Sequence, residues 1–464
     1  MTASEAKRGR GMKTEAIDLQ KMNTGRNLFR MSIPIFIELL LQLLVGNIDQ
    51  IMVSQYSQGS VAAIVNANQV MNLIIIVLNM TSMGTTVVLS QYLGAKDELN
   101  ASRTCSISLF LSSILGVIVT AFILLAQRSI FPLLHVPAEI VEETYIYLTI
   151  VASFTLVQGL YLNFAAILRT YTFMKEVMYV SVVMNVLNII GNVVLINGYL
   201  GMPRLGVAGA AISTVASKTI GMILIIYLFR KKVNLPIGMS YLKPFSMKIF
   251  GQLCKLAFPS GLESFSYQFS QVCILSIVNI FGTMITATKG YCSILSNFSY
   301  IYAIAMGSAT QIVVGYLLGA KQPDEIEKRT WNTLKISIVV CEVMTGVLFL
   351  SCNWLMRIFT SDPAAIALAR NIFMIEFLLE FGRACNITMT RCLIAVGDIK
   401  TPIIVGIGGH WLIAWLFSYI FGIVCGWGLE GVWLAMALDE TIRGIIYIFR
   451  FRQRKWRKAV TEQG

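Results

Sequence analysis

The amino-acid sequence predicts an all-α polytopic membrane protein with about twelve spanning helices in two six-helix lobes. Of the 464 residues, 56% are hydrophobic and only 13% are charged, which is more apolar surface than a soluble domain can bury. Apolar segments recur along the whole chain, each long enough for a helix to cross a bilayer. Short motifs of the first half return in register in the second half, which indicates an internal duplication.

Six apolar segments precede the longest polar tract of the chain interior, and six follow it. This tract, residues 231–250, is the predicted cytoplasmic linker between a lobe of residues 32–230 and a lobe of residues 251–450. Residues 1–31 and 451–464 are predicted to be basic cytoplasmic tails. The predicted spans lie near residues 32–53, 61–90, 104–127, 143–168, 177–197, 206–229, 252–281, 285–317, 331–352, 366–395, 402–423 and 429–449.

The positive charges predict the orientation of the chain. If the N-terminus lies inside, the outer loops carry little beyond Arg128, Arg204 and Arg357. We therefore expect a multi-pass protein of the cell (inner) membrane with both termini in the cytoplasm. The formal net charge of +13 fits a membrane surface, and we expect no nucleic-acid partner. The polar, basic N-terminal tract lacks the apolar core of a cleaved signal peptide.

The duplication can be read from matching motifs. Pro34 and Pro259 each precede a Glu by four residues, at an offset of 225 positions (259 − 34). The tracts SQYLGAK and GYLLGAK, which end at Lys96 and Lys321, have the same offset (321 − 96). Because each half has an even number of spans, we expect the copies to be related by an axis along the membrane normal. A substrate site is then expected between the halves, near the bilayer midplane.

Ionisable residues inside the spans are candidates for ion coupling, because each costs at least about 2.5 kcal/mol in a bilayer. In the first span, Glu38, Gln42 and Asp49 recur at helical spacing on one stripe. The seventh span keeps the first acid as Glu263, but it has Tyr267 in place of Gln42 and no acid in place of Asp49. Asp49 is therefore the acid that the second half lacks.

Amide side chains on the fifth span are the predicted partners of Asp49. Asn188 and Asn192 are one helical turn apart, and Gly191 allows another helix to approach closely. Amide oxygens suit hydrogen bonding to a carboxylic acid or ligation of a cation. Asp49, Asn188 and Asn192 thus form a candidate sodium site, and we expect no other metal and no cofactor.

A second polar cluster lies on the last three spans. Two of its acid–base pairs, Glu380 with Arg383 and Asp439 with Arg443, are at helical pair spacings, so much of the cluster is expected to neutralise itself. Its members are Glu376, Glu380, Arg383, Asn386, Asp398, His410, Trp411, Asp439, Glu440 and Arg443.

Over essentially the whole chain, these motifs resemble the multidrug and toxic compound extrusion (MATE) transporters, of bacterial type, within the multidrug/oligosaccharidyl-lipid/polysaccharide exporter superfamily. The first span, P-x3-E-x10-D, resembles the family's opening helix, with its Asp at Asp49. NIIGNVVLINGYLGMPRLGVAGAAIST, from Asn188 to Thr214, resembles the family's fifth and sixth helices. EFGRACN and GLEGVWLAMALDETIRG resemble its second half. Each motif is weak by itself, and together they are specific.

The resemblance implies a V-shaped fold of two lobes, and antiport of protons or sodium ions against organic cations, which are small amphipathic compounds. Thr214 joins Asp49, Asn188 and Asn192 in the expected ion-coupling set. Family members with a first-lobe ion site carry Asn-x3-Asp on the fifth helix, whereas this chain has Asn192 in place of the Asp. This difference weakens the case for sodium and leaves Asp49 as the main titrating group. The expected substrate cavity or second-lobe polar cluster comprises Glu38, Gln42, Glu263, Tyr267, Glu380, Arg383, His410 and Asp439.

Structural roles stay open for several of these residues. Asp49 is either a coupling residue or a hydrogen-bond anchor at the membrane boundary, and Asn188 and Asn192 either coordinate ions or join helices. Glu38 and Glu263 follow a proline near the predicted helix starts, where an acid also stabilises free N–H groups and the helix dipole.

The second cluster has comparable alternatives. Arg383 with Glu380 is either a structural ion pair or a substrate clamp, and His410 is either a core residue or a proton relay.

Three function classes compete. An exporter of organic cations fits the single titrating acid and the family motifs, with membrane lipids as surroundings and a monomer as the expected state. A lipid or lipid-linked oligosaccharide flippase needs several cations in its cavity, for which Lys218, Lys289 and Arg383 are the candidates. A membrane enzyme is not expected, because the chain has two His and neither metal-ligand spacing nor a nucleophile motif.

Overall fold

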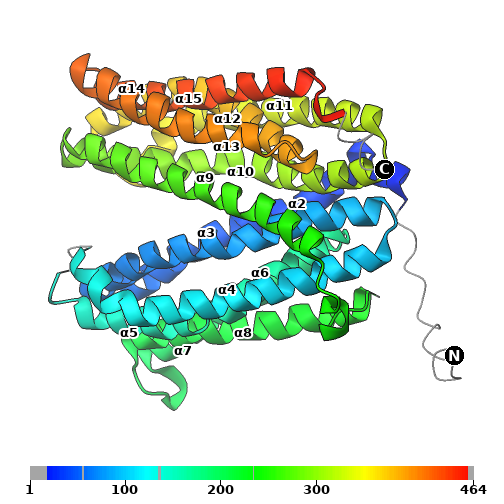
Figure 1. Ribbon diagram of the computed structural model, residues 1–464. Helices are drawn as coiled ribbons and strands as arrows, with labels where there is room; N and C mark the ends of the chain where they lie inside the picture. Colours follow the sequence, from blue (N-terminus) through cyan, green and yellow to red (C-terminus); the bar gives the residue numbers. More distant parts are fainter. Residues whose placement is uncertain (1–17, 55–56, 134–136, 234, 458–464) are drawn as a thin grey trace, which may run out of the picture. The chain divides into compact units, whose positions relative to one another are not determined.

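The computed structural model describes residues 18–54, 57–133, 137–233 and 235–457, and these ranges are helical without any β-strand (Figure 1). Helices suit a chain in lipid, because they satisfy their own backbone hydrogen bonds. The helices are α1 (Leu19–Met22), α2 (Gly25–Ser54), α3 (Gln58–Gly94), α4 (Glu98–Leu133), α5 (Val141–Ser153), α6 (Thr155–Thr170), α7 (Met174–Asn197), α8 (Gly206–Lys232), α9 (Met247–Asn279), α10 (Thr283–Gly319), α11 (Pro323–Met356), α12 (Pro363–Ala395), α13 (Lys400–Gly409), α14 (Leu416–Tyr419) and α15 (Gly428–Arg452).

Short irregular helices complete the description. Two 3₁₀ turns, η1 (Tyr199–Gly201) and η2 (Met239–Leu242), lie in connections. Two π-helical turns, η3 (His410–Trp415) and η4 (Ile420–Val424), continue α13 and α14 as one helical run. Such π turns inside a helix are frequent at functional positions, and η3 begins at His410, a predicted site residue.

Each predicted span corresponds to a long helix or a helical run. Within the described ranges, eight helices are long and apolar enough to cross a membrane, or nine if α5 and α6, which bend by 48° at their junction, form one span. The remaining long helices, α9, α12 and α15, carry charged residues that lower their hydropathy. On α12 and α15 five of these charged side chains are buried and paired: Glu376, Glu380, Asp439, Glu440 and Arg443. The prediction of an all-α polytopic membrane protein is confirmed.

The chain forms two compact units. Unit 1 contains Ile37–Leu93 and Asp97–Ala257, with the segment that ends at Thr24. Inside it, α7 packs along α8, α4 packs against α6, and α5 packs against α8. Buried side chains such as Leu78 on α3 and Leu148 on α5 form part of its apolar core. These contacts position the polar face of α7 against α8.

Unit 2 contains Gly25–Phe36, Gly94–Lys96 and the chain from Phe258 onwards. α12 packs against α10, α11 and α15, and its contact with α15 is extensive. Apolar residues that include Phe373 and Trp433 form the core between these helices. Since α12 and α15 lie along each other, the polar residues on their facing sides meet inside the unit. The lobe, linker and tail boundaries given above stay predictions.

Equivalent positions of the two halves have the same local structure. Helices α3 and α10 both contain 37 residues. Just beyond their ends, Lys96 and Lys321 have φ values of 58° and 57°, a left-handed conformation that non-glycine residues rarely adopt. Gly206 and Gly428, the first residues of the similar tracts GVAG and GLEG, begin α8 and α15. The duplication read from the motifs is thus present in the backbone.

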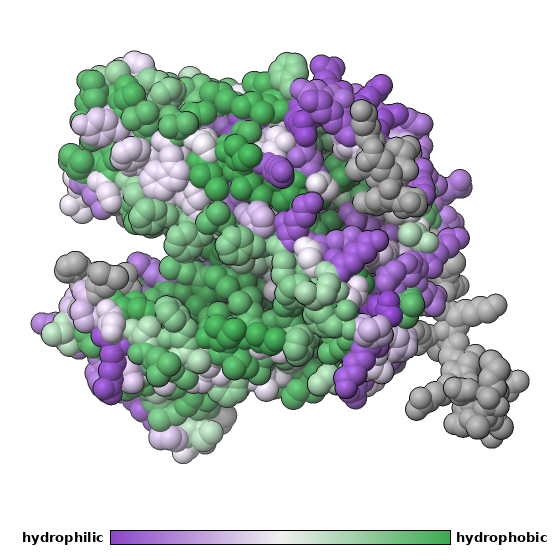
Figure 2. All heavy atoms as spheres, in the orientation of Figure 1, coloured by the Kyte–Doolittle hydropathy of each residue, from purple (hydrophilic) through white to green (hydrophobic). Residues whose placement is uncertain are grey.

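Exposed apolar side chains cover much of the sides of the helices, as the green surface in Figure 2 shows. Examples are Phe122 and Leu125 on α4, and Val339 and Leu350 on α11. Patches of this extent are unusual on a soluble monomer, whereas in a bilayer they face acyl chains.

Candidate functional site

Four buried carboxylates and two arginines lie between α12 and α15 in unit 2. Glu376, Glu380 and Arg383 follow each other on one face of α12, at spacings of four and three residues. Asp439, Glu440 and Arg443 lie on α15, and most of these side chains have little exposed surface. We call these six residues the buried charge cluster.

In the α12 part of the cluster, Arg383 is shared by two acids. Its Nη1 forms an ion pair with Glu380 and lies 3.8 Å from Glu376 Oε1. The guanidinium also lies over the ring of Tyr300, with Cζ 4.5 Å from the ring centre. Glu376 accepts further hydrogen bonds from Ser296 Oγ, at 2.5 Å, and from Trp433 Nε1. The second oxygen of Glu380, Oε2, has no hydrogen-bond partner in the described chain.

In the α15 part, Arg443 is likewise shared by two acids. It donates from Nε to Asp439 Oδ1 at 3.0 Å and from Nη2 to Oδ2 at 2.6 Å, and it lies 3.0 Å from Glu440 Oε1. The second Glu440 oxygen accepts from Asn386 Nδ2 on α12 at 2.5 Å. Gly409 allows this packing, because a Cβ there would collide with Asp439 and Arg443.

The cluster contains more negative than positive groups. If all six residues are ionised, four carboxylates face two guanidiniums, and the surplus is two negative charges. Such a surplus is expensive away from water, so it favours uptake of a proton or a cation. The predicted self-neutralisation is therefore correct for the pairs Glu380–Arg383 and Asp439–Arg443, but it is incomplete for the cluster.

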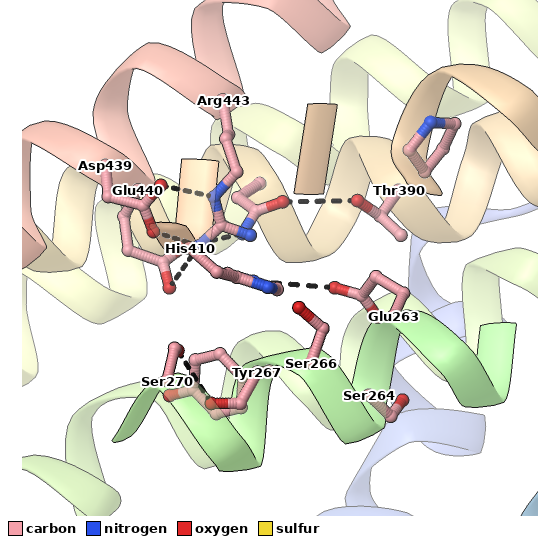
Figure 3. Close-up of polar contacts among 12 residues, drawn as sticks. Glu263, Ser264, Ser266, Tyr267, Ser270, Thr390, His410, Asp439, Glu440 and Arg443 are labelled. Carbon is pink, nitrogen blue, oxygen red and sulfur yellow. Dashed lines mark hydrogen bonds and ion pairs between the residues drawn. The ribbon is translucent and has the colours of Figure 1, made fainter. Parts of the chain in front are cut away.

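A second group of predicted residues lies beside Arg443 (Figure 3). His410 Nε2 is 3.8 Å from Glu263 Oε1, and the His410 ring packs edge-on to Tyr267 with centroids 5.3 Å apart. Neither imidazole nitrogen has a hydrogen-bond partner in the described chain, although the side chain is buried. Trp411, next to His410, donates to Ser266 Oγ at 3.1 Å. The structure therefore brings α9 and the π turn η3 together through these residues.

In unit 1, Glu38 has a partner that the sequence reading missed. Arg169 Nη2, in the last turn of α6, lies 2.6 and 2.7 Å from the two Glu38 oxygens, and Gln42 Nε2 lies 3.5 Å from Oε1. The alternative role for Glu38 and Glu263 near a helix start is wrong. α2 begins at Gly25 and α9 at Met247, so both acids lie several turns inside their helices.

Arg169 was missed because it directly follows the predicted span 143–168. The available signal was its position: it follows an otherwise uncharged apolar segment, where an arginine at the membrane edge needs an acidic partner. The contacts of Ser296 and Trp433 with Glu376 had no such signal, because they depend on how α10, α12 and α15 pack.

The predicted first-half ion site is described in part. Asn188 and Asn192 are buried on α7. Asn188 Nδ2 lies 3.3 Å from Thr214 Oγ1 and 3.4 Å from Ser213 Oγ on α8. Gly191 permits this approach, since a Cβ there would collide with Ser213. Asp49 belongs to α2, but its side chain lies outside the described part of the structure.

No group of three His, Cys, Asp or Glu side chains in the described chain is placed to hold a metal ion. The site as described consists of carboxylates, guanidiniums, amides and hydroxyls in two helical units. These groups bind protons, monovalent cations and charged organic molecules.

Comparison with known proteins agrees with this arrangement. The family described as MatE matches residues 34–194 and 259–420, one stretch in each half of the duplication. The chain belongs to the MATE family. Among its MATE relatives, the "Uncharacterized transporter YisQ" of Bacillus subtilis is 33% identical over 430 residues, which cover 93% of this chain and 94% of that protein. The "Probable multidrug resistance protein NorM" of Thermotoga maritima is 26% identical over 435 residues, with 93% of each protein covered.

A solved structure has the same fold. The "Crystal structure of MATE in the bent conformation" matches with a TM-score of 0.87 and 23% identity, and the match covers 97% of this chain and 99% of that one. The MATE resemblance inferred from the motifs is confirmed. The protein is a multi-pass membrane transporter and not an enzyme.

Proposed function

We propose that this MATE protein is a secondary antiporter that exports organic compounds, cationic and amphipathic, in exchange for protons or sodium ions. The observation that carries the proposal is the surplus of carboxylates over guanidiniums in the buried charge cluster of unit 2. Among the relatives, the Thermotoga maritima protein is named a probable multidrug resistance protein, which supports export of drug-like compounds.

The surplus supports ion coupling for an electrostatic reason. Buried carboxylates without enough arginines are stable only when they bind a proton or a cation. An organic cation and a coupling ion both neutralise the same charge, so binding of one favours release of the other. This competition becomes transport when the two ligands favour different conformations of the protein.

The first-half site is proposed as a second location for the ion. Asp49 is hypothesised to titrate, with Asn188, Asn192 and Thr214 as neutral partners. The described contacts between Asn188 and Thr214 support this hypothesis, because they gather amide and hydroxyl groups between α7 and α8. Cytoplasmic termini, a monomeric state and lipid surroundings belong to the same proposal.

The alternative flippase function has less support. It needs free cations to hold a pyrophosphate group, and Arg383 was one of three candidates. In the structure, Arg383 is paired with Glu380 and lies close to Glu376. Its charge is therefore already neutralised, which favours the antiporter.

The function is tested by uptake of a fluorescent organic cation into everted membrane vesicles, energised separately by a proton gradient and a sodium gradient. We expect one of the gradients to drive uptake by the wild type, and Asp49→Asn and Glu380→Gln each to abolish the driven component. Glu325→Gln is the matched control, since Glu325 is an exposed acid whose ion pair with Lys328 spans 4.0 Å.

Two results would count against the proposal. Wild-type uptake that does not depend on either gradient would exclude ion-coupled antiport. Uptake at wild-type rates in both Asp49→Asn and Glu380→Gln, at normal expression, would remove the two acids from the coupling mechanism.

A further inference from the structure

An open pocket of about 700 Å³ lies at one end of unit 2, apart from the buried charge cluster. It is lined by Glu327, Trp331 and Lys335 on α11, and by Arg452 and Arg454 at the end of α15.

The pocket carries uncompensated positive charge. Glu327 is its acid, and both of its oxygens are occupied: Arg454 Nη2 lies 2.7 Å from Oε1 and Arg457 Nη2 lies 2.5 Å from Oε2. Lys335 and Arg452 have no acidic partner within the described residues. With Glu327 satisfied by its two arginines, these two cations remain available for an anionic ligand.

The walls of the pocket are fixed by aromatic packing. The Arg452 guanidinium lies over the Trp331 ring, with Cζ 5.8 Å from its centre. Trp331 in turn packs edge-on to Phe451, on which Trp456 stacks at 5.1 Å. Trp456 Nε1 donates to the Phe451 carbonyl at 3.1 Å, and so holds the turn after α15 in place.

The pocket also stands at the end of an apolar, outward-facing stripe. On α11, residues exposed at helical spacing continue directly from Lys335: Ile336, Val339, Val343, Val347 and Leu350. From Ile336 to Leu350 this stripe extends about 21 Å at 1.5 Å per residue, most of a bilayer core of about 30 Å. On α15, Ile445 and Phe449 are also exposed just before Arg452. A tryptophan and two cations at the end of such stripes mark the lipid–water boundary.

We propose that this pocket binds the headgroup of an anionic phospholipid. Lys335 and Arg452 hold the phosphate, Trp331 contacts the glycerol region, and the acyl chains lie along the exposed stripes of α11 and α15. A free phosphate explains the two cations but not the adjoining apolar stripe, so the lipid accounts for both observations. The charge distribution of the sequence places this headgroup in the cytoplasmic leaflet.

The test is native mass spectrometry of the purified full chain in detergent, titrated with phosphatidylglycerol, phosphatidylcholine or inorganic phosphate. We expect one retained phosphatidylglycerol per chain, with weaker retention of phosphatidylcholine and no displacement by inorganic phosphate. The double variant Lys335→Gln/Arg452→Gln is expected to weaken phosphatidylglycerol binding about twenty-five-fold, since each cation near the lipid surface contributes about fivefold.

The matched control is the double variant Arg230→Gln/Lys231→Gln. It removes the same charge from the exposed end of α8, where Lys231 also lies over an aromatic ring, that of Tyr227, but these residues do not line the pocket. It should change the affinity less than threefold, and Lys335→Arg should retain binding. Should the pocket double variant not fold, the two single variants are expected to lose about fivefold each.

Three results would overturn the proposal. A pocket variant that binds phosphatidylglycerol as tightly as the control variant would show that Lys335 and Arg452 do not hold the lipid. Equal affinity for phosphatidylcholine and phosphatidylglycerol would show that only apolar contacts bind it. Displacement of the lipid by inorganic phosphate at similar concentration would identify a simple anion site.

Discussion

Replacing Arg383 by Gln should destabilise unit 2 in a way that depends on pH. Arg383 is the cation nearest to Glu380, whose second oxygen has no hydrogen-bond partner in the described chain. Glu376 keeps its bonds from Ser296 and Trp433 when the arginine is removed, so the loss falls mainly on Glu380. Breaking one side of a buried ion pair typically costs about 3 to 5 kcal/mol.

The pH sets an upper bound on the stability that Arg383→Gln loses. An unpaired glutamate escapes its penalty by taking up a proton, and with an ordinary pKa of about 4.3 this uptake costs about 3.7 kcal/mol at pH 7. At pH 5 the same uptake costs only about 1 kcal/mol. Folding of the variant therefore takes up a proton that the wild type does not need, and acid stabilises the variant relative to the wild type.

The assay is thermal unfolding of both proteins in detergent from pH 5 to pH 8. We expect the stability deficit of Arg383→Gln to shrink as the pH falls from 7 to 5, and Glu380→Gln/Arg383→Gln to recover most of the stability at pH 7. Arg370→Gln, an exposed arginine of α12 over the Phe349 ring, is the control and should lose less than about 1 kcal/mol at either pH. A deficit that is constant with pH, or that grows in acid, would refute the charge-cluster reasoning.

Three further predictions concern unit 1. Asn192→Asp should shift the pH optimum of transport or add a sodium dependence, because it places a second acid in the proposed site with Asp49; an unchanged profile in the vesicle assay would make Asn192 a packing residue. Gly191→Val should separate α7 from α8 and lower the melting temperature, since its Cβ would collide with Ser213, and an unaltered melt would contradict that close approach. Asn163→Ala should cost about 1 to 2 kcal/mol by removing a buried bond to Ser112 Oγ at 2.6 Å without altering the coupling ion, which thermal melts and gradient-driven uptake together would check.

The sequence by itself determined the class of the protein and the positions of its helices. Apolar segment length decides whether a helix crosses a bilayer, and this property is local to each segment. The duplication was also readable, because it preserves short motifs such as the one that ends at Lys96 and Lys321, and these have the same left-handed backbone in both halves. Pairs within one helix, such as Asp439 with Arg443, followed from helical spacing alone.

Only the tertiary structure decided which charges from different helices meet. Glu38 pairs with Arg169, 131 positions along the chain, and Glu376 meets Ser296 and Trp433 from two other helices. Helical periodicity gives the face on which a residue lies, but it does not say which helix packs against that face. The surplus of carboxylates in the cluster and the free cations of the α11–α15 pocket are therefore properties of packing, which no single segment encodes.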